Sequence, residues 1–187
     1  MLLDELDVTP FTDEEEANAR RYKHQFMPNL FPAPRDKRFF LPPEEGGFRY
    51  ECVDTIERFE EITADVKDRW IGGDVETNGL DFSRHHVVGF SFALSPYEAY
   101  YVPFRHLIGK NCPEKEIVPR IRDFHYRNKW VYYYWTFDGP MLANEGLDLE
   151  RIPKLMDAAA LVYNTDSNMK QINLKWASAH FLGRPYP

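Results

Sequence analysis

The chain has 187 residues, 43% hydrophobic and 16% aromatic, which is enough to bury the core of one domain with an appendage. This composition excludes a wholly disordered chain, and no apolar run reaches the ~20 residues that cross a bilayer, so no membrane partner is expected. The two cysteines, Cys52 and Cys112, cannot build a disulfide framework, and the N-terminus lacks a secretory signal. A cytoplasmic setting is therefore expected.

The net charge of −7 comes from the N-terminal tip. Residues 1–16 contain seven acidic residues and no Lys or Arg, whereas residues 17–187 contain 23 residues of each sign. The sequence therefore does not indicate a broad basic face for duplex DNA. It does not exclude a nucleic acid held through metal ions.

Residues 1–47 are predicted to form an acidic, proline-rich N-terminal arm. Five prolines between positions 28 and 43 block regular helices and ladder pairing. Phenylalanine and leucine residues between these prolines are too apolar for a simple linker. We expect an extended arm that lies on a surface, either of its own domain or of a partner.

Residues 48–187 show the alternation of an α/β domain. Strands are predicted at 48–54, 69–75, 87–94, 99–104 and 129–135, and the third and fourth form an antiparallel hairpin. Helices are predicted after a cap at Asp54 or Thr55 and at 113–128, 137–145, 157–164 and 172–182. This order predicts a mixed β-sheet flanked by helices.

The run Asp74-Val75-Glu76-Thr77-Asn78-Gly79-Leu80-Asp81 is the strongest chemical signal. Strand alternation places Asp74 and Glu76 on the same side of the chain, where a strand gives way to a loop. Their like charges repel unless a cation neutralises them, and hard oxygen ligands suit Mg²⁺ or Mn²⁺. The alternative interpretation is a solvated turn with incidental acids.

Two further acids follow predicted elements. Asp138 follows Phe137 directly after the strand at 129–135 and opens a helix, where an acid also has an ordinary role beside the helix dipole. Asp157 lies in LMDAAALVYN, where it is also explained as an acid at a helix N-terminus.

Together, GGDVETNGLDF, VYYYWTFDGPML, GLDLERIPKLMDAAALVYN and NLKWASAHFLG resemble the proofreading 3′–5′ exonuclease domain of family A DNA polymerases. This domain belongs to the DEDD exonuclease superfamily, and the resemblance covers roughly residues 48–183. It implies an RNase H-like fold in which two Mg²⁺ or Mn²⁺ ions activate a water for attack on the terminal phosphodiester. Asp74 and Glu76 would bind the tighter ion, and Asp138 would help to hold the second, through water.

The resemblance also implies a substrate, the single-stranded 3′ end of DNA, from which nucleoside 5′-monophosphates are released. Leu80 and Phe82 follow the acids and could stack on the terminal bases or simply fill the core. The other residues expected to bind the substrate are Thr77, Tyr134 and Phe137.

Two departures from the family pattern stand out. The family usually has Asn four residues before the second-motif Asp, where this chain has Tyr134. The last motif, Y-x-x-x-D or a His-containing equivalent, is missing, because only Arg184-Pro185-Tyr186-Pro187 follow Gly183. We therefore expect a C-terminally incomplete exonuclease domain that needs another segment or chain, and a polymerase domain in cis or in trans as its partner.

Three functions remain open from the sequence. The leading hypothesis is a proofreading 3′–5′ exonuclease in the cytoplasm of a bacterial or phage-infected cell. The second is an RNase D-like enzyme that trims RNA 3′ ends, since nothing indicates recognition of the 2′-hydroxyl. The third is a non-catalytic exonuclease-like scaffold that docks a polymerase, which the missing motif and Tyr134 favour.

Overall fold

The computed structural model describes residues 49–165 and 173–182. The chain divides into two compact units, of which the larger spans Phe48–Thr165. In the other unit the described residues form one helix, α6 (Leu174–Leu182), whose first turn is capped where Oδ1 of Asn173 accepts a 2.8 Å hydrogen bond from the amide of Trp176. The arm expected at residues 1–47 lies outside the described residues.

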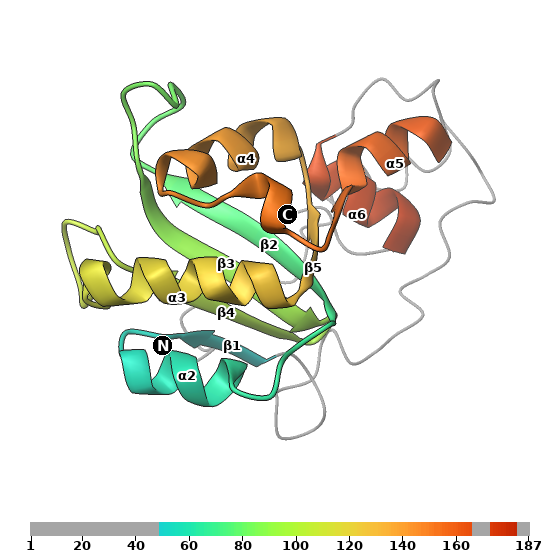
Figure 1. Ribbon diagram of the computed structural model, residues 1–187. Helices are drawn as coiled ribbons and strands as arrows, with labels where there is room; N and C mark the ends of the chain where they lie inside the picture. Colours follow the sequence, from blue (N-terminus) through green and yellow to red (C-terminus); the bar gives the residue numbers. More distant parts are fainter. Residues whose placement is uncertain (1–48, 166–172, 183–187) are drawn as a thin grey trace, which may run out of the picture. The chain divides into compact units, whose positions relative to one another are not determined.

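The larger unit is built on a six-stranded mixed sheet with the order β1-β4-β3-β2-β5-β6 (Figure 1). The strands are β1 (Arg49–Cys52), β2 (Trp70–Thr77), β3 (Val87–Ser95), β4 (Glu98–Pro103), β5 (Lys129–Tyr132) and β6 (Lys154–Asp157). Strands β2, β3 and β4 are antiparallel neighbours, whereas β1 runs parallel to β4, and β5 runs parallel to both β2 and β6. The carboxyl ends of β2, β5 and β6 therefore meet at one edge of the sheet.

The helices of this unit are α2 (Ile56–Thr63), α3 (Glu114–Arg127), α4 (Trp135–Asn144) and α5 (Ala158–Thr165), and a single 3₁₀ turn spans Leu149–Arg151. The hydroxyl of Thr55 caps α2 by accepting a hydrogen bond of 3.2 Å from the amide of Arg58. Of the two caps that the sequence suggests, Thr55 is the one used.

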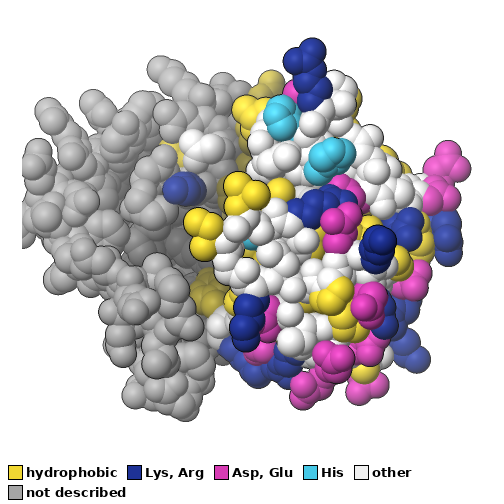
Figure 2. Space-filling model, turned by 90° about the vertical axis from the view of Figure 1, so that its left-hand side faces the viewer, with side chains coloured by type: hydrophobic (Ala, Val, Ile, Leu, Met, Phe, Trp, Pro, Cys, Tyr) yellow, Lys and Arg dark blue, Asp and Glu magenta, His cyan; other side chains and the backbone are white. Residues whose placement is uncertain are grey.

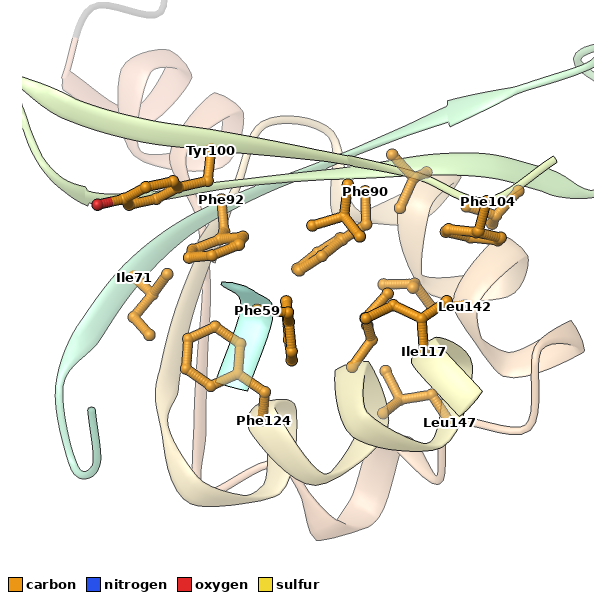
Figure 3. Close-up of a cluster of buried hydrophobic side chains, with 14 of the residues drawn as sticks. Phe59, Ile71, Phe90, Phe92, Tyr100, Phe104, Ile117, Phe124, Leu142 and Leu147 are labelled. Atoms are coloured by element: carbon orange, nitrogen blue, oxygen red, sulfur yellow. The ribbon is translucent and has the colours of Figure 1, made fainter. Parts of the chain in front are cut away.

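The main hydrophobic core lies between one face of the sheet and the helices α2 and α3 (Figure 3). Phe59 from α2 and Phe124 from α3 meet edge to face, with ring centroids 5.9 Å apart, and both contact Phe92 of β3, at 6.0 and 5.3 Å. Ile117 and Ile121 of α3 are buried two turns and one turn before Phe124, so the spacing seen in the sequence is the buried face of this helix.

A polar pair, His125 of α3 and Tyr132 of β5, lies in this core. The His125 ring stacks on Trp130 with centroids 4.1 Å apart, and its Nε2 lies 2.7 Å from the hydroxyl of Tyr132. His125 Nδ1 lies 2.7 Å from the carbonyl oxygen of Ile121. Because a carbonyl only accepts, Nδ1 carries the proton, and Nε2 accepts from Tyr132.

The mixed sheet, the order of the elements and the hairpin of β3 and β4 confirm the predictions from the sequence. One strand was predicted too long, and another was not predicted. The strand expected at 129–135 ends at Tyr132, because Tyr134 adopts a left-handed backbone with φ of 66° and Trp135 already begins α4. Strand β6 was not predicted, because four residues between turns leave too little periodicity to separate a strand from a loop.

A candidate carboxylate site at the end of strand β2

Strand β2 presents two acids at its carboxyl end. Val75 is 6% exposed and points into the core, so alternation places its neighbours Asp74 and Glu76 on the other side of the strand. Both acids retain exposed surface. The pairing of β2 with β3 shifts register between Glu76 and Thr77, so the strand is distorted directly after the second acid.

Helix α4 brings a third acid to the same place. Asp138 lies in the first turn of α4 and is 3% exposed. Its Oδ1 accepts a hydrogen bond of 3.2 Å from the backbone amide of Val75, the residue between the two acids of β2. Positions 63 residues apart in the sequence are thus joined at the predicted site.

The three acids repel one another. Partial desolvation, followed by the charge of Glu76, raises the pKa of Asp74 to about 6. Burial, followed by the charge of Asp74, raises the pKa of Asp138 to about 7. Asp74 therefore lies close to both other carboxylates. Among the described residues, no Lys or Arg forms an ion pair with any of the three acids.

A fourth acid, Asp157 at the end of β6, fixes the start of α4. Its Oδ1 accepts hydrogen bonds from the amides of Tyr134 (3.2 Å) and Ala159 (2.9 Å), and its Oδ2 accepts one from the amide of Trp135 (3.0 Å). One carboxylate thus caps α4 and also the start of α5. This arrangement holds Tyr134 in its left-handed conformation and sets the turn that carries Asp138.

The donor chemistry of Asp74, Glu76 and Asp138 fits a hard divalent cation, since a cation would relieve the repulsion that raises two of the pKa values. Across residues 49–165 and 173–182, however, no three His, Cys, Asp or Glu side chains are grouped closely enough to hold one ion. The site is thus a cluster of repelling carboxylates without a preformed three-ligand cage in the described chain.

The residues expected to contact a substrate occupy two places. Leu80 and Phe82 lie in the loop after β2 and are 83% and 53% exposed, so neither fills the core. The hydroxyl of Thr77 donates a 2.8 Å hydrogen bond to the carbonyl of Gly79 and shapes the start of this loop. Tyr134, 40% exposed, and Phe137, which packs against the core, flank the start of α4.

The loop after β2 is anchored at both ends. Oδ1 of Asn78 accepts a 2.8 Å hydrogen bond from the amide of His86, and the side chain of Asn144 on α4 donates to the carbonyl of Phe82. Close by, the guanidinium of Arg105 donates to both carboxylate oxygens of Glu145, at 2.6 and 2.7 Å. These bonds join the loop, the end of α4 and the start of β3 into one support for the exposed side chains.

Acidic, basic and histidine side chains are interspersed on the face of the molecule shown in Figure 2. No field of a single sign dominates the described part of this face, as expected from the balanced charge of residues 17–187. Binding of a polyanion here would therefore depend on local contacts and on cations rather than on a basic surface.

Comparisons with known proteins give evidence on the fold. The chain is 29% identical over 141 residues to DNA polymerase I of Borreliella burgdorferi, which covers 74% of this chain and 14% of the polymerase. NrnC of Brucella melitensis has a similar structure, with a TM-score of 0.54 at 15% identity over 75% of this chain and 62% of that one. No protein-family model matches.

A third similar structure is Pol1 of M. smegmatis, described as the POL domain in complex with a DNA primer-template and dNTP. The TM-score is 0.55 at 13% identity, over 73% of this chain and 23% of that one. The body of the chain therefore shares an RNase H-like fold with these proteins. The resemblance drawn from the four sequence motifs is thereby confirmed, and the chain spans about one seventh of the length of the curated polymerase that it matches.

The sequence alone predicts the three acids of the candidate site and points to Asp157, but it does not predict how they are connected. Asp157 was read as an acid at the start of its own helix, which is correct for Ala159. Its bonds to Tyr134 and Trp135 depend on the pairing of β6 with β5, and β6 was not predicted. In the described part of the chain no helix is long and apolar enough to cross a membrane.

Proposed function

We propose that this chain is a 3′–5′ exonuclease domain that removes nucleotides from single-stranded 3′ ends as nucleoside 5′-monophosphates, in proofreading beside a family A polymerase domain supplied in cis or in trans. The observation that carries the proposal is the convergence of Asp74, Glu76 and Asp138 at the carboxyl end of β2. Desolvation and the charge of a neighbouring carboxylate raise the pKa values of Asp74 and Asp138, and this suits a site where a divalent cation binds.

Asp74 and Glu76 would hold one divalent ion, and Asp138 would help to hold a second through water. When bound, two such ions supply an activated water and neutralise charge on the phosphate that is attacked. NrnC has been described with bound Mg²⁺ and bound to pGG, and it shares the fold at 13% and 16% identity, which supports this proposal. The cytoplasm of a bacterial or phage-infected cell is the proposed location.

The exposed side chains beside the acids suit the end of a single strand. Leu80 and Phe82 stand on an anchored loop directly after β2, and an exposed aromatic ring can stack on a base of any sequence. Tyr134 and Phe137 lie at the start of α4. The frayed terminal nucleotide would lie between these two groups, with its phosphate at the carboxylates.

The site is proposed to need a further carboxylate from another segment or chain, because the described residues supply no three-ligand group. The same observation favours the second candidate, a non-catalytic scaffold that docks a polymerase. Mn²⁺ binding separates the two candidates, since a scaffold has no need to retain a metal site.

The direct test uses a single-stranded oligonucleotide with a labelled 3′ end, Mg²⁺ or Mn²⁺, and the chain with and without the candidate completing polypeptide. We expect metal-dependent release of 5′-mononucleotides that Asp74→Ala abolishes. Asp123 is an exposed aspartate of α3, and the control variant Asp123→Ala should leave this release unchanged. A matched RNA oligonucleotide distinguishes proofreading of DNA from RNA trimming. If calorimetry detects no Mn²⁺ binding either with or without the completing polypeptide, the exonuclease proposal fails in favour of the scaffold.

A further inference from the structure

A tyrosine lies beside Glu76 on the face of the sheet that carries the acids. Tyr100 and Val102 of β4 are buried in the core, at 4% and 0% exposure, so alternation directs Tyr101 to the opposite face. On β3, Gly89 is the residue directly paired with Glu76. On β4, Gly89 is paired with Pro103, and the side chain of Tyr101, two residues before Pro103, reaches diagonally over Gly89.

The hydroxyl of Tyr101 occupies the place that a side chain at position 89 would take. A Cβ atom built on Gly89 would lie 2.0 Å from this hydroxyl, so only glycine permits the approach. The Cβ atoms of directly opposed residues in an antiparallel pair are about 4.5–5.5 Å apart. The phenol group therefore ends beside the Glu76 side chain, and the charge of Glu76 is one of the causes, after burial, that raise the pKa of Tyr101 to about 12.

His106 holds the phenol in this place. Its Nε2 is hydrogen-bonded to the hydroxyl of Tyr101, and the two rings meet edge to face with centroids 5.6 Å apart. The backbone of His106 is in turn fixed by Asn111, whose side chain accepts from the His106 amide at 2.8 Å and donates to the His106 carbonyl at 2.9 Å. The pair is thus an ordered unit at the end of β4 and not a loose surface contact.

We propose that Tyr101, supported by His106, is a positioning residue for the Glu76 carboxylate and thereby for the divalent ion that Glu76 would hold. This inference rests on the proposed function, because it assigns a role within the same site. A hydroxyl offers one donor and accepts through its lone pairs. If Nε2 of His106 carries the ring proton and donates to the phenol oxygen, the phenol O–H is released to donate to Glu76 or to a water bound there.

Such a partner orients a carboxylate without touching the ion. Groups that hydrogen-bond to metal ligands fix the direction of the ligand and its basicity, and their removal typically costs 10- to 100-fold in metal affinity or activity. The two residues are 25 positions apart, and only the register of three strands brings them together. Gly89, Tyr101 and His106 therefore carry no sign of this role in the sequence.

The test measures the Kd of Mn²⁺ on the full chain by the electron paramagnetic resonance signal of the free ion, with the melting temperature recorded for each variant. Tyr101→Phe is expected to raise the Kd about 10-fold with little change in melting temperature. Gly89→Ala displaces the phenol and should raise the Kd as well. The matched control is Tyr100→Phe, which removes a neighbouring hydroxyl bonded to Glu98 on the core side and should leave the Kd unchanged.

His106 provides the second comparison. The side-chain amide of Gln can donate from near the position of Nε2, so His106→Gln should retain most of the affinity that His106→Ala loses. A Tyr101→Phe variant with the wild-type Kd overturns the inference and leaves the proposed function standing. A wild-type chain with no saturable Mn²⁺ binding overturns the proposed function, and this inference with it.

Discussion

The backbone amide of Val75 donates a hydrogen bond of 3.2 Å to Oδ1 of Asp138, and this bond ties helix α4 to strand β2 at the centre of the carboxylate site. Val75 is buried, and Asp138 is 3% exposed. The bond therefore fixes Asp138 beside Asp74 even though the two charges repel. The repulsion between these carboxylates lowers the stability of the folded protein, and such a cost is expected where a bound cation would neutralise the charges.

Replacing Asp138 with Asn is expected to stabilise the metal-free protein above neutral pH. The folded-state pKa of Asp138 is about 7, above its unfolded value of 3.8, so the folded state binds more protons between these values and loses stability as the pH rises through this window. Asn cannot ionise, and its side-chain oxygen can still accept from Val75. Thermal unfolding in chelator should show an advantage of Asp138→Asn over wild type that grows from pH 5 to pH 8.

The comparison with wild type is needed because His125 acts in the opposite direction. Burial lowers the pKa of His125 to about 4, so its contribution to stability rises with pH between that value and its ordinary 6.5. The difference between wild type and Asp138→Asn cancels this contribution. An advantage that stays constant from pH 5 to pH 8 would contradict the raised pKa. Mn²⁺ should stabilise wild type more than the variant.

Removing the carboxylate of Asp157 is expected to destabilise the domain by about 2–3 kcal/mol, because two helix starts lose their caps at about 1 kcal/mol or more each. Asp157→Asn keeps one acceptor oxygen and should cost about half as much. The free energy of unfolding from urea titration measures both. Asp148→Ala is the matched control, since Asp148 caps a single 3₁₀ turn through Glu150 and should cost about 1 kcal/mol or less. Equal losses at the two positions would refute the double cap.

The strength of each local pattern explains how much of the fold could be predicted from the sequence. Helix α3 buries Ile117, Ile121 and Phe124 at helical spacing over 14 residues, so its position was evident. Strand β6 has four residues and pairs only with β5, and its existence depends on a partner distant in the sequence. Short parallel strands at a sheet edge lack a local signal of their own.

The same distinction applies to the site. Asp74 and Glu76 could be identified because strand alternation is local, and Asp138 because it follows a strand. The bond between Val75 and Asp138 depends on how α4 packs, which no spacing in the sequence encodes. Tyr134 shows this limit most clearly, since a run of aromatic residues predicted a continuous strand, whereas the bonds to Asp157 turn the backbone into the left-handed region.

Tyr134→Asn is expected to be neutral or to stabilise the protein by up to about 1 kcal/mol. A left-handed backbone costs a residue with a Cβ about 1–2 kcal/mol, and Asn tolerates it better than bulky residues do. The family resemblance places Asn at this position. Tyr133→Asn is the control, because Tyr133 does not have a positive φ and its substitution relieves no backbone strain. Urea titration should rank Tyr134→Asn above Tyr133→Asn, and the reverse order would show that Tyr134 is not strained.

The buried pair of His125 and Tyr132 is expected to behave as a unit in a double-mutant cycle. His125→Phe leaves the Tyr132 hydroxyl without its acceptor, and Tyr132→Phe leaves Nε2 of His125 without its donor, so each should cost about 1–3 kcal/mol of unfolding free energy. The double variant removes both polar groups and should cost at least about 1 kcal/mol less than the sum. His125→Phe should also abolish the part of the stability that wild type gains between pH 4 and 6.5. Strict additivity would show that the two side chains do not share the hydrogen bond.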